Sequence, residues 1–175
     1  MSASTSSELR IVPAEENQLP LVLSFIRKLA EYERLSHEVV ADEESLRRSL
    51  FGPNRAAEVV FACIGDQPVG YAVYFQTFST FSGGRGIYLE DLFVEPAHRS
   101  KGVGKAVLSY LARLAKERDC VQLNWAVLDW NQPAIDFYRK LGATPREEWT
   151  VFRLAGEALE SLARQEQTVT SEGLV

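Results

Sequence analysis

Apolar residues recur along the chain with two spacings, one typical of helices and one of strands. Apolar positions three or four residues apart predict helices at residues 19–32, 42–51, 102–118, 133–141 and 157–164. Short runs rich in β-branched and aromatic residues, bounded by turn residues, predict strands at residues 9–12, 59–64, 69–77, 87–94, 121–127 and 149–154. Residues 78–86 are rich in Gly and Ser, which predicts a mobile loop able to form part of a substrate lid.

Length and composition fit one folded domain. The chain has 175 residues, of which 46% are hydrophobic, and we expect a core over residues 8–165 between flexible tails at residues 1–7 and 166–175. No apolar run approaches the roughly eighteen residues that span a bilayer. The first residues also lack the apolar segment of a signal peptide. We therefore expect a cytosolic protein without a membrane partner.

Thiol and imidazole groups form no metal-ligand pattern. Cys63 lies within an apolar run and Cys120 just before another, which favours two buried, reduced thiols. His37 and His98 lack the spacing of paired ligands. We therefore assign no metal.

The charge balance disfavours nucleic acid as a partner. The formal net charge is −5, whereas binding to a nucleic-acid backbone needs a basic face. Residues 31–44 contain six acids against a single arginine, Arg34. Such a run is either a solvated surface or an acidic mouth that attracts a cationic amine.

The segment from Arg99 to Lys105 has the chemistry of an anion-binding loop. It follows an apolar strand and opens an amphipathic helix. N–H groups at a helix N-terminus lack intrahelical partners and bind pyrophosphate. Gly102 and Gly104 let the backbone approach that anion. Arg99, Lys101 and Lys105 add positive charge around it.

Two residues restrict which diphosphate this loop fits. A dinucleotide-binding fingerprint needs Gly or Ala where Val107 stands, and a nucleotide P-loop needs Ser or Thr where Ala106 stands. The loop therefore fits a diphosphate-bearing cofactor other than NAD or ATP.

A second motif, Asn-x-x-Ala-x-x-Phe-Tyr-x-x-x-Gly, begins at Asn131 and ends at Gly142. Pro133 suits the first turn of a helix, and Gly142 supplies a left-handed stop. Phe137 and Tyr138 are either ordinary core aromatics on that helix or part of a cofactor site.

Together, the Arg-x-x-Gly-x-Gly loop and the Asn131 motif resemble those of the GNAT superfamily of N-acetyltransferases. Residues 30–33, 88–94 and 130–133 further resemble the spermidine/spermine acetyltransferase branch, and the similarity covers residues 10–164. The resemblance implies a single-domain α/β fold, with a mixed, mostly antiparallel central sheet flanked by helices. It also implies acetyl-CoA as the cofactor.

The resemblance implies the residues of the site as well. Those expected to bind the cofactor are Leu92, Phe93, Val94, Arg99, Ser100, Lys101, Gly102, Val103, Gly104, Lys105, Asn131, Pro133, Ala134 and Tyr138. Those expected to bind the substrate are Tyr32, Glu33, Glu90, Asp91, Asn124, Trp125 and Ala126. With the apolar residues 149–152, the resemblance also favours a homodimer formed through the C-terminal half.

Acetyl transfer to an amine needs a base, an acid and a polarised carbonyl. A primary amine has a pKa of about 10, so a carboxylate must accept its proton, directly or through water. We expect Glu90 in this role with Asp91 as support, because two adjacent acids on opposite faces of a strand cannot both be buried cheaply. By resemblance, Tyr138 would protonate the leaving thiolate. The N–H groups of residues 92–94, where the family strand bulges, would polarise the carbonyl.

The predicted function is transfer of an acetyl group from acetyl-CoA to a primary amine of a small cationic acceptor, such as a polyamine, a diamine or a lysine analogue. Two alternatives stay open. The acceptor could be an amine of a protein or peptide, or the chain could be a catalytically idle acyl-CoA-binding module. Retention of both Glu90 and Tyr138 counts against the idle module.

Overall fold

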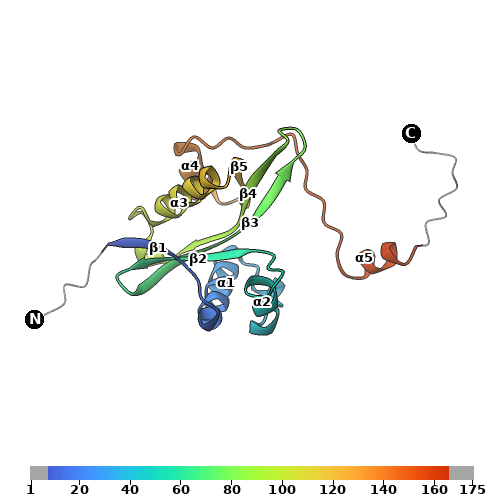
Figure 1. The fold of residues 1–175 in the computed structure, drawn as a ribbon, viewed down its shortest axis with the longest axis horizontal. Helices are drawn as coiled ribbons and strands as arrows, with labels where there is room; N and C mark the ends of the chain where they lie inside the picture. Colours follow the sequence, from blue (N-terminus) through green and yellow to red (C-terminus); the bar gives the residue numbers. More distant parts are fainter. Residues whose placement is uncertain (1–7, 166–175) are drawn as a thin grey trace, which may run out of the picture. The chain divides into compact units, whose positions relative to one another are not determined.

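The computed structural model describes residues 8–165, so the two tails expected from the sequence lie outside the described residues. Contacts divide the chain into two compact units, on either side of the bond between Asn131 and Gln132. The first unit holds one five-stranded sheet (Figure 1). Its strands, in spatial order, are β1 (Leu9–Pro13), β2 (Glu58–Ile64), β3 (Gln67–Ser79), β4 (Gly84–Val94) and β5 (Cys120–Trp125).

The sheet is mixed and mostly antiparallel, as predicted. Strands β1 to β4 pair antiparallel, and only β5 runs parallel to its neighbour, β4. Helices cover both of its faces: α1 and α2 lie on one, and α3 lies on the other (Figure 1). The bounds of these helices are α1 Leu19–Glu33, α2 Glu43–Leu50 and α3 Val103–Glu117.

Aromatic packing fixes α1 against the centre of the sheet. Phe25 of α1 stacks on Tyr71 of β3, with 5.3 Å between ring centroids, and its centroid lies 6.0 Å from that of Phe93 in β4. All three rings are buried, so their burial contributes several kcal/mol in total, at about 1.5–3 kcal/mol for a large apolar side chain. Helix α1 then ends at Arg34, whose backbone is left-handed with φ 62°. The C-terminal half of α1 therefore runs beside the end of β4.

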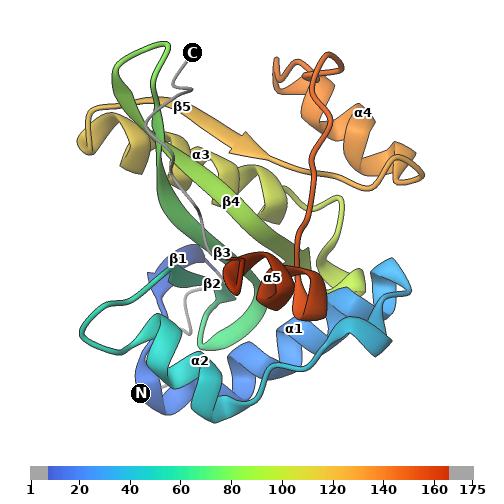
Figure 2. The same ribbon diagram turned by 90° about the vertical axis from the view of Figure 1, so that its right-hand side faces the viewer.

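The mobile loop predicted at residues 78–86 is mostly a paired hairpin instead. Strand β3 continues to Ser79, β4 begins at Gly84, and these two residues face each other in the ladder (green in Figure 2). The glycines are needed here because neighbouring side chains approach the backbone closely, and they do not indicate a flexible loop. A Cβ at Gly84 would lie 2.9 Å from a methyl of Val121, and one at Gly86 would lie 2.8 Å from Thr77 Oγ1.

The second unit contains two short helices, α4 (Gln132–Lys140) and α5 (Gly156–Ala163). As predicted, α4 is followed by a left-handed glycine, Gly142, with φ 89°. The strand predicted at residues 149–154 is absent: these residues have no regular structure. A strand exists only through its hydrogen bonds to another, and residues 132–165 contain no other strand. Trp149, Val151 and Phe152 are accordingly exposed.

No helix within residues 8–165 is long and apolar enough to cross a membrane.

Candidate active site

Strand β4 loses its neighbour on one side halfway along its length. Its pairing with β5 runs only to Leu89, opposite Trp125. Just beyond, its register with β3 shifts, because Val73 faces Asp91 whereas Tyr74 faces Leu89. Glu90 is therefore the extra residue of a β-bulge. The resemblance implied a bulge at residues 92–94, and the observed bulge lies at Glu90, just before them.

The bulge is followed by backbone amides that face the open side of β4. The N–H of Glu95 donates to the carbonyl of Val69 in β3, at 2.8 Å. Since residues of an antiparallel pair alternate in direction, Leu92 and Val94 point their N–H groups away from β3. Strand β5 pairs with β4 only as far as Leu89, so no strand within residues 8–131 pairs with Leu92 or Val94 on this side. These two amides are thus placed where they can donate to a bound carbonyl oxygen.

The two adjacent acids of β4 lie in different environments. Glu90 is exposed, whereas Asp91 is partly buried and its Oδ2 accepts a hydrogen bond of 2.6 Å from the hydroxyl of Tyr71. Burial raises the pKa of Asp91, and the hydrogen bond from Tyr71 works against that rise. Tyr71 was not predicted as a site residue, because in the sequence it is one aromatic residue within an apolar strand.

Glu33, at the end of α1, belongs to the same acidic group. Burial raises its pKa, and the negative charge of Asp91 raises it further. No cation of residues 8–165 pairs with either carboxylate. The structure thus brings Glu33 and Asp91 together, as the predicted substrate site requires. An ammonium group placed there would relieve both raised pKa values.

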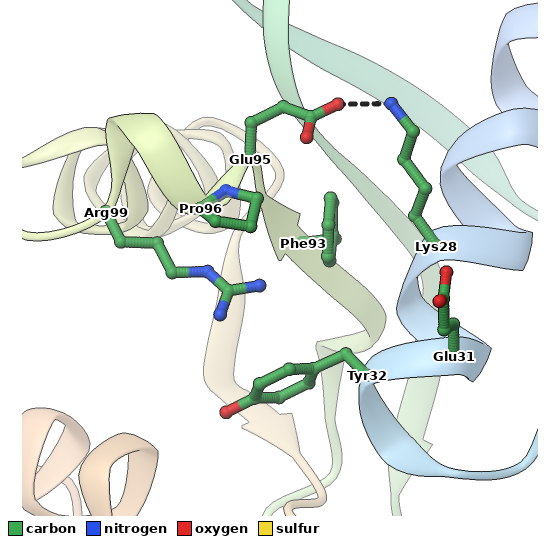
Figure 3. A pocket seen from close by; sticks show the side chains of 7 residues that line it. All are labelled: Lys28, Glu31, Tyr32, Phe93, Glu95, Pro96 and Arg99. Atoms are coloured by element: carbon green, nitrogen blue, oxygen red, sulfur yellow. Dashed lines mark hydrogen bonds and ion pairs between the residues drawn. The ribbon is translucent and has the colours of Figure 1, made fainter.

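A pocket of about 370 Å³ opens between α1 and the end of β4. Figure 3 shows the side chains that line it: Lys28, Glu31, Tyr32, Phe93, Glu95, Pro96 and Arg99. Lys28 forms an ion pair with Glu95 at one edge of the pocket. The pocket therefore combines apolar walls with charges of both signs.

Arg99 is directed toward α1. Its Nε donates to the carbonyl of Val94 at 2.9 Å, and its guanidinium carbon lies 4.5 Å from the ring centroid of Tyr32 and 5.4 Å from that of Phe93. The hydroxyl of Tyr32 donates to Oδ1 of Asn131 at 3.3 Å, and Asn131 is buried. Residues that were predicted separately for cofactor and substrate thus contact one another.

The glycine loop ends in a left-handed residue. Gly102 precedes α3 with φ 83°, a backbone geometry that favours glycine. No described side chain caps this 15-residue helix. Its first N–H groups are therefore open to an anion, which at this position has the helix dipole in its favour.

The remaining predicted residues lie at the end of β5 and in the second unit. Asn124 pairs with Tyr88 and Trp125 with Leu89, next to the bulge of β4, and Ala126 follows directly. Tyr138 lies on α4, partly exposed, with its ring centroid 5.3 Å from that of Phe137. The groups gathered around β4 come from the first unit alone.

Comparison with known proteins places this geometry in a family context. The model of the acetyltransferase (GNAT) family matches residues 25–143. The chain is 42% identical to the thialysine N-epsilon-acetyltransferase of Sus scrofa over 161 residues, which cover 86% of the chain and 94% of that protein. It is 30% identical to spermidine/spermine N(1)-acetyltransferase-like protein 1 of Homo sapiens, over 95% of the chain and 25% of that protein.

A solved structure agrees with these sequence matches. The integron cassette protein VCH_CASS6, from the mobile metagenome of V. cholerae, superposes with a TM-score of 0.74 and 29% identity. The match covers 90% of the chain and 98% of that structure.

Proposed function

The chain belongs to the acetyltransferase (GNAT) family and is an acetyl-CoA-dependent N-acetyltransferase, and we propose that its acceptor is a primary amine of a small cationic molecule. The observation that carries this proposal is the pair of carboxylates, Asp91 and Glu33, with raised pKa values and no cation partner within residues 8–165. A polyamine, a diamine or a lysine analogue supplies the missing positive charge.

The glycine loop supports acetyl-CoA as the acyl donor. Residues 99–105 lead into the uncapped N-terminus of α3, and left-handed Gly102 leaves room for an anion beside the backbone. The other residues in the proposed cofactor site are Leu92, Phe93, Val94, Asn131, Pro133, Ala134 and Tyr138. When bound there, the cofactor supplies an activated acetyl thioester.

The chain's own groups perform the proton transfers. Glu90, exposed at the bulge, accepts the proton of the attacking amine directly or through water, and Asp91 binds the ammonium form. The N–H groups of Leu92 and Val94 donate to the oxygen that becomes negative. Tyr138 donates its phenolic proton to the departing sulfur.

An acceptor panel tests the proposal. Thiol release from acetyl-CoA is measured with thialysine, spermidine, putrescine, a neutral aryl amine and a basic peptide. We expect rapid release with the small cations and slow release with the aryl amine. Release with the peptide alone would instead favour a protein acceptor. Binding of acetyl-CoA without release by any amine would favour the idle module.

Two further expectations stay predictions. A homodimer formed through the C-terminal half is consistent with the exposed apolar side chains of Trp149, Val151 and Phe152. We likewise propose a cytosolic location.

A further inference from the structure

The C-terminal half of α1 lies beside the end of β4, and charged side chains of the two elements face each other. Side chains two residues apart on a strand share a face, so Asp91, Phe93 and Glu95 all face α1. The ion pair between Lys28 and Glu95 agrees with this alignment, as does the negative charge of Asp91, which raises the pKa of Glu33. Asp91 therefore lies two residues before Phe93, which lines the pocket of Figure 3, and on the same face of β4.

Two charged groups in the pocket have no counter-charge. Lys28 and Glu95 neutralise each other. Arg99 donates a hydrogen bond from its Nε to the Val94 carbonyl and forms a cation–π contact with the Tyr32 ring. No carboxylate within residues 8–165 pairs with its guanidinium. Glu31 likewise forms no ion pair with a described residue. The pocket thus presents one guanidinium and one carboxylate to a ligand.

We propose that this pocket binds the amino-acid head of a lysine-type acceptor, with the α-carboxylate on Arg99 and the α-ammonium on Glu31. The inference rests on the proposed function and specifies which cationic amine is used. A guanidinium forms paired hydrogen bonds with a carboxylate, and Arg99 is held in place by its contacts with Tyr32 and Val94.

The spacing of residues along β4 agrees with such an acceptor. Asp91 lies two residues from Phe93, which lines the pocket, and two residues of a strand span about 7 Å. This span is close to the extended length of a lysine side chain. A head group in the pocket therefore directs the terminal amine along β4 toward Asp91 and the amides of Leu92 and Val94.

Paired substrates test the role of each charge. Lysine is compared with cadaverine, which lacks the carboxylate, and with 6-aminohexanoate, which lacks the α-ammonium. The readout is kcat/KM at saturating acetyl-CoA. Because a hydrogen bond to a charged group is strong, we expect the protein to prefer lysine over each analogue by about ten- to a hundredfold.

Two substitutions assign the preferences to residues. Arg99→Gln should remove the preference for lysine over cadaverine, and Glu31→Gln the preference for lysine over 6-aminohexanoate. Any effect of Arg99→Gln on cofactor use enters both rates and cancels in their ratio. Glu43→Gln, an exposed acid of α2 outside the pocket, is the matched control and should leave both ratios unchanged.

Three results would overturn the inference. One is equal use of lysine and cadaverine by the wild-type protein. Another is an unchanged lysine-to-cadaverine ratio in Arg99→Gln with a raised KM for acetyl-CoA, which would assign the guanidinium to a cofactor phosphate. Failure of the proposed function differs from both, since no amine would then release thiol, and the inference would fall with it.

Discussion

Replacing Tyr71 with Phe should shift the pH dependence of amine acetylation. The substitution keeps the buried ring that stacks on Phe25 and removes only the hydroxyl that donates to Asp91. A hydrogen bond to a charged acceptor contributes about 1.5–3 kcal/mol, against about 1 kcal/mol for a neutral acceptor. The difference, roughly 1.4 kcal/mol, corresponds to about one pKa unit. The pKa of Asp91, already raised by burial, should therefore rise further in the variant.

The assay is kcat/KM for a cationic acceptor between pH 5 and pH 9. Binding of the ammonium needs ionised Asp91, so the acidic limb of the profile should move upward by about one pH unit. Stability should respond with a defined sign. Because the folded-state pKa of Asp91 lies above its unfolded value, stability falls as pH rises through that window, and more so in the variant. The loss of unfolding free energy should be about 2 kcal/mol at pH 7 and smaller in acid.

Tyr74→Phe is the matched control for this experiment. Tyr74 is a second buried tyrosine of β3, and its hydroxyl donates to Glu58 at 3.4 Å. Glu58 is already bound by Arg118, so this change should leave the acidic limb in place. An unshifted limb in Tyr71→Phe, or an equal shift in both variants, would refute a role for Tyr71 in orienting Asp91.

Three other changes test the fold and the mechanism. Hydrogen bonds from Arg118 lower the pKa of Glu58, so Glu58→Gln should cost about 1 kcal/mol of stability at pH 7. This cost should vanish as pH falls through the folded-state pKa of Glu58. Equal urea midpoints of the variant and the wild-type protein at pH 7 would contradict the pairing of Glu58 with Arg118. Gly102→Ala should lower the free energy of unfolding by about 1 kcal/mol, because φ 83° is strained for alanine although the added Cβ meets no atom within 4 Å. It should also reduce the rise in melting temperature that acetyl-CoA causes. An undiminished rise would argue against the loop as the cofactor site. Tyr138→Phe should lower kcat by about 10²-fold with acetyl-CoA affinity unchanged, whereas wild-type kcat with a lower melting temperature would make Tyr138 a core residue.

Local patterns carried most of the fold prediction. The helical spacing of α1 and α3 and the glycine before α3 depend on residues close together in sequence, and these features were predicted to within a residue or two. The loop predicted at residues 78–86 was wrong because Gly84 and Gly86 make room for side chains of β3 and β5, and β5 is distant in sequence. The predicted final strand failed for a similar reason, since pairing depends on a partner that its own residues do not specify.

The candidate site was predictable to a similar extent. Charge and glycine spacing identified the acids of β4 and the loop at Arg99. Tyr71 and Asp91 are twenty positions apart in the sequence, and no local pattern predicts the hydrogen bond between them. The same holds for Arg99 and Tyr32, which meet only because aromatic packing places α1 beside β4.

The bulge at Glu90 also changes how this strand can evolve. Leu89 pairs with Tyr74, whose phenol interacts with Tyr110 of α3, whereas Asp91 bonds Tyr71 beneath α1. Two residues that a regular strand would place on one face therefore lie on opposite faces. Loss of the Glu90 codon would remove the bulge and leave the later side chains of β4 on their present faces, because Leu89 and Asp91 already pair with the successive residues Tyr74 and Val73. Loss of a codon in the regular part of the strand would instead turn the later side chains over.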